Sequence, residues 1–374
     1  MDRRKFMGFA AGGVCLACAS RLVAKEAPEV ADHTLTVVSG NPRERGRQYG
    51  RRFKDGIHAF LDNEIYRPFA SSSRDELLQY AGRCAKAIEQ YSPIIMEELE
   101  GMAEGTGLKL EEHVLLTLHE ELYHRGILPK IEHCTVLAAG PPDTADGNAY
   151  VGQTWDWMAS VYGLSQMLLW KRPEGPSVLA YAYPGLWVGA GLSSAGLAFG
   201  WTSAWDKEGI GGPRVGIPSY VLIAHLLYQE SLEAAVDEAR RAKPAGWFTT
   251  VWVDGQGKMA NIESTPTELA IEMGRGRMAR HTYGSRQITR TPSGQPVQHT
   301  PKCRRMQELL ESGQGKLDRS TLQSFFADEQ ISVVYNDSNF TIDSMLFNTT
   351  RREAHLTRGT GGAGGWNTFR FDGD

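Results

Sequence analysis

The residue pattern of this 374-residue chain changes at Cys134. Before that cysteine, apolar residues recur at helical spacing, as in DELLQYAGRCAKAIEQY, and the Ser92-Pro93 step predicts the start of a helix that ends at Gly105. After it, short apolar runs are separated by turn residues such as Asp146-Gly147 and Asp254-Gly255, which indicate strands and hairpins. We therefore expect a helical zone and a strand-rich zone that meet at Cys134.

The same patterns predict the individual elements. Helices are expected over most of 42–129, over 219 to about 242, and near 303–312 and 320–326. Strands or hairpins are expected at 34–38, 149–157, 167–183, 193–204, 247–264, 267–273, 344–347 and 354–357.

Charge excludes some classes of partner. The chain has 40 basic and 44 acidic residues, spread along its length, for a formal net charge of −4. The sequence contains no basic stripe that would indicate nucleic-acid binding and no acidic tail that would indicate a solvating segment. We expect a small-molecule or peptide-like partner and no cofactor.

The first 25 residues resemble a twin-arginine export signal. MDRRKFMGFAAGGVCLACAS contains paired arginines, a short run rich in Ala and Gly, and an A-x-A-like cleavage site. The run is too short and Gly-rich for a stable membrane span, which needs about 20 apolar residues. An uncleaved anchor, or a lipoprotein signal that uses Cys18, is the alternative. We expect removal of the signal and a periplasmic or secreted protein.

Removal of the signal would leave three of the five cysteines, Cys84, Cys134 and Cys303. An odd number in an oxidising compartment leaves at least one thiol unpaired, and such a thiol is either buried or used in chemistry. Cys84 lies on an apolar helix face and Cys303 adjoins a helix start, so both are expected to pack in the core. Cys134 is the candidate for chemistry.

Three other motifs do not predict a site. In LHEELYH, His119 and His124 are five residues apart, which puts them about 140° apart around a helix and argues against a zinc site. GLSSAG lacks the G-x-S-x-G spacing of a serine nucleophile. The basic run RERGRQYGRR is expected to be a solvated turn rather than a phosphate site.

The segment CTVLAAGPPDTADGNAYVGQTWDW predicts a hairpin that brings Asp156 back toward Cys134. An internal cysteine has a thiol pKa of about 8.5 and no base of its own, and His133 points the opposite way in an extended segment. A cysteine at a chain terminus carries an α-amine with a pKa of about 7.7 to 8.0, which can accept the thiol proton. Nucleophile and base would then belong to one residue.

Three segments resemble the acyl-coenzyme A:6-aminopenicillanic acid acyltransferase family of cysteine N-terminal nucleophile hydrolases. They are GNPRERGRQYG, EELEGMAEGTGLKLEE and CTVLAAG…DGNAYVGQTWDW. The resemblance implies an α+β fold, a four-layer αββα sandwich, made as a precursor that cuts itself between His133 and Cys134. Residues 26–133 would form a mainly helical alpha segment and 134–374 the catalytic beta segment, and the two would stay associated.

The resemblance also implies roles for single residues. Cys134 would be the nucleophile and, once freed, the base, and Asp156 would orient its amine. Thr135 would help self-cleavage or donate near the oxyanion, and Trp155 and Trp157 would line an acyl pocket or pack in the core. Thr249 stands near the place of the family's oxyanion asparagine, and Tyr283 replaces the asparagine of a common His-Thr-Asn step. Arg304 or Arg305 would supply a guanidinium to the site or lie on the surface.

The resulting function is an amidohydrolase or acyltransferase that works through a Cys134 thioester. Coenzyme A thioesters are scarce in the periplasm, so amide hydrolysis of a substrate with a hydrophobic acyl group is expected. The alternative is a catalytically silent exported binding protein that keeps the fold. Thr249 and Tyr283, which depart from the family pattern, keep that alternative open.

Overall fold

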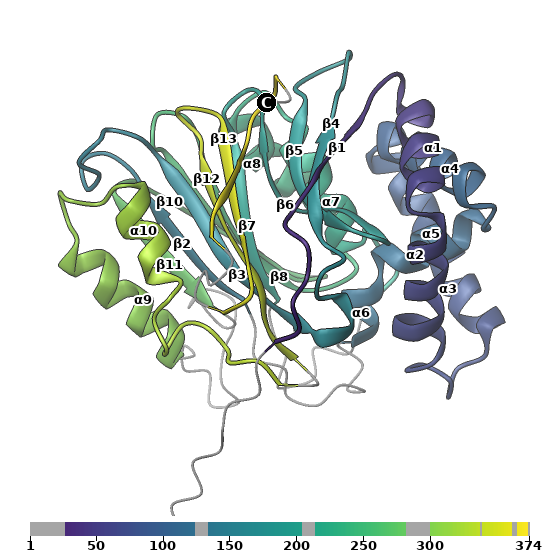
Figure 1. The fold of residues 1–374 in the computed structure, drawn as a ribbon. Helices are drawn as coiled ribbons and strands as arrows, with labels where there is room; N and C mark the ends of the chain where they lie inside the picture. Colours follow the sequence, from purple (N-terminus) through teal and green to yellow (C-terminus); the bar gives the residue numbers. More distant parts are fainter. Residues whose placement is uncertain are drawn as a thin grey trace, which may run out of the picture.

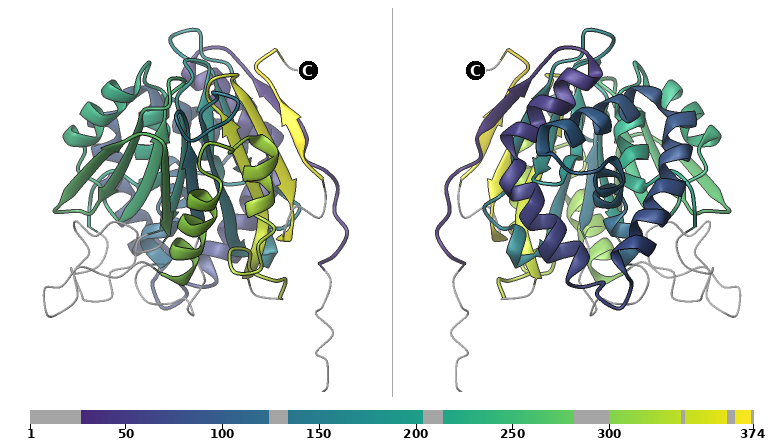
Figure 2. Two further views of the ribbon diagram at one scale, coloured as in Figure 1. Left: turned by 90° about the vertical axis from the view of Figure 1, so that its left-hand side faces the viewer. Right: turned by 90° about the vertical axis from the view of Figure 1, so that its right-hand side faces the viewer.

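Two sheets packed face to face form the centre of the protein, and helices cover their outer faces (Figure 1). The computed structural model describes residues 27–123, 134–203, 214–281, 300–336, 339–360 and 365–372. Helices α7 and α8 pack on the eight-stranded sheet, and α9 packs on β2 and β11 of the six-stranded sheet. Figure 2 shows α9 and α10 in front of the six-stranded sheet in one view and the N-terminal helices in the opposite view. The expected α+β, four-layer αββα architecture is confirmed.

In each sheet, the order of neighbouring strands differs from their order along the chain. In the eight-stranded sheet this order is β1 (Leu35–Val38), β4 (Gln166–Trp170), β5 (Val178–Tyr183), β6 (Leu186–Ser193), β7 (Ala198–Ser203), β8 (Phe248–Val253), β9 (Met259–Ser264) and β10 (Leu269–Gly274). In the six-stranded sheet it is β11 (Arg277–His281), β2 (Thr135–Ala139), β3 (Tyr150–Met158), β12 (Asn339–Asn348), β13 (Glu353–Arg358) and β14 (Asn367–Phe369).

The helices fall into an N-terminal group and two covering pairs. The N-terminal group is α1 (Pro42–Arg52), α2 (Lys54–Phe60), the π-helix η1 (Leu61–Tyr66), α3 (Arg74–Tyr91), α4 (Pro93–Thr106), α5 (Leu110–Thr117) and α6 (His119–Tyr123). The covering pairs are α7 (Ser219–Leu227) with α8 (Leu232–Arg241) and α9 (Pro301–Ser312) with α10 (Arg319–Phe325), and a 3-10 turn, η2, spans Ala159–Val161. The helical stretch expected over 219 to about 242 consists of the two helices α7 and α8.

The contact between the sheets explains a glycine in β7. A Cβ added at Gly200 would meet Val136 Cγ1 at 2.9 Å and Gln153 Oε1 at 3.1 Å. Gln153 Oε1 also accepts a hydrogen bond of 2.7 Å from the backbone N–H of Trp201. Side chains of β2 and β3 therefore press directly on the backbone of β7, and only a residue without a side chain fits there.

The basic run expected to be a solvated turn is instead helix α1, and that prediction was wrong. Its glycines allow α1 to lie against α4, since an added Cβ at Gly46 would overlap the carbonyl oxygen of Glu98. Arg45 is buried and donates to Glu98 Oε1 at 2.7 Å. The periodic glycines were a helix-packing signal, which a count of basic residues does not detect.

Helix α4 begins as predicted but ends later. Pro93 is its first residue, yet the Ser92 hydroxyl bonds His225 Nδ1 at 2.9 Å instead of capping the helix backbone. The helix runs past Gly105 to Thr106, because the residue that takes the left-handed conformation is Gly107, with φ of 77°. The other glycine, Gly105, packs against α1.

The residues before Cys134 are part of the sandwich as well as of the helical group. Strand β1 pairs in parallel with β4. His33 Nε2 lies 2.8 Å from Asp343 Oδ1 on β12, and Tyr49 donates to the carbonyl of Tyr183 at 2.8 Å. Among the described residues, no helix is long and apolar enough to cross a membrane.

Candidate active site

Cys134 lies directly before strand β2 and is 8% exposed. Strands β2 and β3 form the predicted antiparallel hairpin, with Val136 opposite Gln153. The same register, continued by two residues, puts Cys134 opposite Trp155 and beside Asp156. The hairpin therefore brings the Cys134 thiol and the Asp156 carboxylate together, as expected from the turn pattern in the sequence.

The thiol of Cys134 is held in its neutral form. Burial raises its pKa, and the Asp156 carboxylate raises it further. The backbone N–H of Asp156, which bonds the sulfur, and the Lys302 ammonium act in the opposite direction but do not compensate. Attack by this sulfur consequently requires a group that removes its proton.

Asp156 is buried and bonded from two sides. Its Oδ2 accepts a hydrogen bond of 2.9 Å from Lys302 Nζ on α9, and its Oδ1 accepts one of 2.6 Å from the Thr341 hydroxyl on β12. Burial raises the pKa of Asp156, against the lowering effect of Lys302 and Thr341. Three elements thus fix this carboxylate beside the start of β2.

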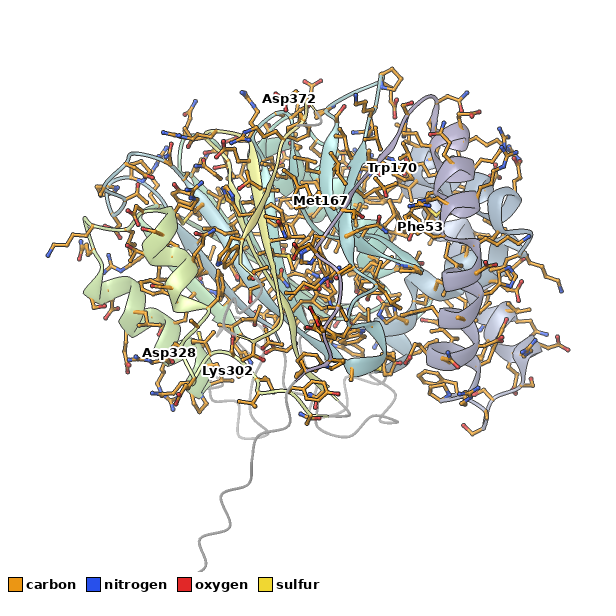
Figure 3. All side chains as sticks on the ribbon, in the orientation of Figure 1. Phe53, Met167, Trp170, Lys302, Asp328 and Asp372 are labelled. Atoms are coloured by element: carbon orange, nitrogen blue, oxygen red, sulfur yellow. The ribbon has the colours of Figure 1, made fainter. Side chains whose placement is uncertain are left out.

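Sequence reasoning missed Lys302, the cation of the site. The sequence offered Arg304 or Arg305 either as a guanidinium of the site or as surface residues; Arg304 is exposed on α9, and Arg305 bonds Asp328 at 2.7 Å. Figure 3 shows Lys302 at the lower end of α9, where the helix begins. The available signal was the position of Lys302 directly before Cys303, a residue expected in the core and found fully buried.

Thr135 and Thr154 link the two strands at the site. The backbone N–H of Thr135 donates to the Thr154 hydroxyl at 3.0 Å. The Thr135 hydroxyl is buried and has no hydrogen-bond partner among the described residues. Thr135 is therefore placed next to Cys134 with a hydroxyl that no described residue bonds.

Thr249 on β8 faces the space between the sheets. Thr249 pairs with Thr202 of β7, and Val251, two residues further along β8, pairs with Gly200. A Cβ added at Gly200 would point toward Val136 of β2. Because side chains alternate along a strand, Thr249 and Val251 share one face of β8, the face that Gly200 turns toward Val136 of β2 and Gln153 of β3. Its hydroxyl is fully buried and unbonded within the described part of the chain.

The two tryptophans beside Asp156 belong to one aromatic cluster. Trp155 is 4.9 Å from Tyr181 and 5.8 Å from Trp201, measured between ring centroids. Trp157 is 5.5 Å from His119 and 5.7 Å from Tyr123. The indole N–H groups of Trp155 and Trp157 are buried and lack a partner among the described residues. The cluster is therefore mainly apolar but contains two indole N–H groups that no described residue bonds.

The remaining residues singled out in the sequence are buried cysteines or lie outside the described part of the chain. Cys84 and Cys303 are fully buried, and neither forms a disulfide bond within the described part of the chain. His133, His124 and Tyr283 lie outside the described residues. Within the described ranges, no group of three or more His, Cys, Asp or Glu residues could hold a metal ion.

Comparison with known proteins adds a relative. No protein-family model matches the chain. The 40 kDa form of acyl-coenzyme A:6-aminopenicillanic-acid-acyltransferase from Emericella nidulans is 23% identical over 284 residues, 74% of this chain and 77% of the relative.

Similar solved structures include an arginine-to-leucine variant of conjugated bile acid hydrolase from Clostridium perfringens, with TM-score 0.45 and 13% identity over 64% of this chain and 93% of that one. Penicillin V acylase from Agrobacterium tumefaciens has TM-score 0.40 and 12% identity over 60% and 83%. The resemblance inferred from the sequence is confirmed: this chain is similar to acyl-coenzyme A:6-aminopenicillanic acid acyltransferase over 74% of its length.

Proposed function

We propose that this chain is a self-cleaving N-terminal nucleophile enzyme that hydrolyses or transfers an acyl group through a thioester on Cys134. The observation that carries the proposal is the position of Cys134 directly before β2, with the Asp156 carboxylate fixed on the next strand. Similarity to an acyltransferase over 74% of the chain supports the same class of chemistry.

Self-cleavage between His133 and Cys134 gives Cys134 an α-amine of its own. With a pKa of about 7.7 to 8.0, roughly a tenth to a sixth of that amine is neutral at pH 7, and this neutral fraction can accept the thiol proton. Asp156, held by Lys302 and Thr341, is close enough to the start of β2 to orient the resulting ammonium. This arrangement supplies the acceptor that the buried thiol needs.

The reaction then runs in two stages. The thiolate attacks the substrate carbonyl carbon, the C–N bond breaks, and the leaving amine takes the proton from the ammonium. Water attacks the thioester in hydrolysis, or an amine attacks it in acyl transfer, and the thiol is restored. The buried Thr249 hydroxyl, which has no partner among the described residues, is available to donate to the oxyanion of both stages.

The aromatic cluster supports a hydrophobic acyl group as the substrate. Trp155, Trp157 and Trp201 bring apolar surface to the end of the sandwich where Cys134 lies. The twin-arginine-type pattern in residues 1–25 supports export to the periplasm or beyond. Hydrolysis is the favoured net reaction there, since coenzyme A thioesters are scarce outside the cytoplasm.

Contacts across the proposed cut support continued association of the two segments. Arg45 Nη2 lies 2.5 Å from Glu174 Oε1, and Glu98 accepts a hydrogen bond of 2.7 Å from Trp170 Nε1. The pairing of β1 with β4 adds backbone hydrogen bonds. These interactions do not depend on the peptide between residues 133 and 134.

The proposal is tested with purified wild type and Cys134→Ala. Each is incubated with N-acyl amino acids, lactams and short acylated peptides, while amine release and the mass of the protein are followed. Wild type is expected to turn over at least one compound and to carry its acyl group on Cys134, and the variant to do neither. Binding without turnover by wild type would instead indicate the silent binding protein.

A further inference from the structure

Strands β6 and β7 are neighbours in the eight-stranded sheet but pair along only part of their length. Their register consists of Gly191 with Phe199 and Leu192 with Ala198, close to the turn that connects the two strands. In the described part of the chain, the earlier residues of β6 and the later residues of β7 do not pair with each other, although β7 stays paired with β8 throughout. We refer to residues 186–190 and 200–203 as the β6–β7 divergence.

The backbone N–H of Trp201 would bond Gly189 of β6 if the two strands stayed together. Hydrogen-bonded pairs recur at every second residue of an antiparallel ladder, and the Ser193 N–H donates to the Leu197 carbonyl at 2.7 Å. Continued along the strands, that series joins 191 to 199 and then 189 to 201. The Trp201 N–H instead donates to Gln153 Oε1, on β3 of the other sheet, at 2.7 Å. Because a buried N–H needs an acceptor, Gln153 supplies the bond that lets β7 leave β6.

The ring of Trp155 lies at the β6–β7 divergence. A Cβ added at Gly189 would lie 2.9 Å from Trp155 Cη2, so the indole rests on the backbone of β6. The same indole is 5.8 Å from the Trp201 indole, measured between ring centroids. Trp155, Trp201 and Gln153 are each at most 2% exposed. Two indoles therefore meet where the ladder between β6 and β7 is missing.

The β6–β7 divergence lies at the level of Cys134. Gln153 pairs with Val136, two residues along β2 from Cys134, and the same register puts Trp155 opposite Cys134. Gln153 and Trp155 share one face of β3, because side chains two residues apart point the same way. That face is turned toward β7, since Gln153 bonds Trp201. The amide of Gln153 is thus built into the same inter-sheet layer as the nucleophile of the proposed mechanism.

We infer that Gln153 is a positioning residue that sets a preference for long or ring-bearing apolar acyl groups. By bonding the Trp201 N–H it keeps β7 apart from β6 and holds the Trp201 indole beside Trp155, so that both rings offer apolar surface to an acyl group on Cys134. An acetyl group has a single methyl to place against these rings, so its turnover depends little on them. The inference rests on the proposed function and assigns the residue that governs its acyl specificity.

The test compares N-octanoyl- and N-acetyl-4-nitroanilide as substrates of the purified protein. The ratio of the two kcat/KM values measures acyl preference and cancels any loss of folded material. Gln153→Met keeps the length of the side chain but has no acceptor for the Trp201 N–H, and it is expected to lower the ratio about tenfold or more, through a higher KM for the octanoyl compound. Its kcat/KM for the acetyl compound is expected to stay within about threefold of wild type.

Gln153→Glu is the conservative variant that should rescue the preference. It keeps an acceptor oxygen for the Trp201 N–H, so its ratio is expected to stay within about threefold of wild type. Gly189→Ala disturbs the divergence from β6, because the added Cβ displaces the Trp155 ring while Gln153 is unchanged. This variant is expected to lower the ratio in the same direction as Gln153→Met, and it keeps the inference testable if Gln153→Met does not fold.

Thr349→Val is the matched control. The Thr349 hydroxyl also joins the two sheets, since it lies 3.0 Å from the carbonyl oxygen of Ala149, directly before β3, and 2.9 Å from that of Asp254, directly after β8. This contact is at the end of β3 away from Trp155. Thr349→Val is therefore expected to lower stability and to keep the wild-type ratio, which separates a general loss of packing between the sheets from the role of Gln153.

The outcomes distinguish the inference from the proposed function. A wild-type ratio in Gln153→Met or in Gly189→Ala, or an equal loss of kcat/KM for both anilides, would overturn the inference alone. A wild type that does not prefer the octanoyl compound would do the same. A wild type that turns over neither anilide nor any compound of the substrate screen above would overturn the proposed function as well.

Discussion

Lys302 Nζ lies 2.9 Å from Asp156 Oδ2 and joins the first turn of α9 to the strand that returns beside Cys134. Both side chains are largely withdrawn from water, with exposed fractions of 11% and 0%. A buried carboxylate costs free energy unless an opposite charge and hydrogen bonds offset its desolvation. Lys302 therefore fixes both the charge and the position of the carboxylate that the proposed mechanism uses.

Lys302→Met tests this pair. The substitution leaves Asp156 without its cation, so we expect a loss of about 3–5 kcal/mol in the free energy of unfolding. Urea unfolding in a Cys134→Ala background, which keeps the chain uncut, measures it. Arg304→Met, an exposed position on the same helix, is the control and should change stability by no more than about 0.5 kcal/mol. Equal effects of the two substitutions would contradict the account.

Thr249→Val tests the oxyanion donor. The hydroxyl has no partner among the described residues, so its removal should leave stability nearly unchanged, while kcat falls about 10²–10³-fold. Thr250→Val is the control on the opposite face of β8, where the hydroxyl accepts from Trp252 Nε1 at 2.8 Å and donates to the Ile262 carbonyl at 3.3 Å. Thr250→Val should lower stability by about 1–3 kcal/mol and spare kcat. An unchanged kcat in Thr249→Val would exclude the assigned role.

Glu121 makes stability depend on pH. Burial raises its pKa to about 7 from 4.5, so the folded state favours the protonated acid. The stabilisation is complete below pH 4.5 and is lost as the pH rises through about 7, and the shift corresponds to about 3 kcal/mol. In the uncut Cys134→Ala background, the wild-type residue should therefore lose about that much relative to Glu121→Gln between pH 4.5 and 8. Parallel curves of unfolding free energy against pH would refute this.

Two glycine substitutions test the packing of α1 on α4. An added Cβ at Gly101 overlaps the carbonyl oxygen of Arg43, which a side-chain rotation cannot relieve, so Gly101→Ala should cost about 3 kcal/mol or more. At Gly82 the nearest atom to an added Cβ is Glu111 Cγ at 3.6 Å, and Gly82→Ala should stabilise α3 by about 0.5–1 kcal/mol. Thermal unfolding of both variants measures the difference. Similar melting temperatures would show that the helices separate easily.

Local sequence signals predicted the elements and the hairpin at Cys134 well. Apolar periodicity located most helices and strands, and the Asp-Gly turns marked hairpins, because these signals depend on neighbours in the chain. The pairing of β1 with β4, and the order of the two sheets, depend on contacts between distant segments and could not be read from the sequence. The basic run of α1 lies in the zone where helices were expected, but it was interpreted as a solvated turn because its glycines act only through their contact with α4.

The candidate site was predictable in part for the same reason. Asp156 follows Cys134 in one hairpin, so turn chemistry alone brings them together. Lys302 is 146 residues from Asp156, so no local pattern joins this pair. The sequence offered several basic residues near 302–305, and only the direction of α9 decides which one is buried.

Mass spectrometry of catalytically active protein under denaturing conditions tests the central claim most directly. The account predicts two polypeptides, the larger of which comprises residues 134–374 and starts with Cys134, while the Cys134→Ala protein remains a single chain. Active material in which residues 133 and 134 are still joined would contradict it.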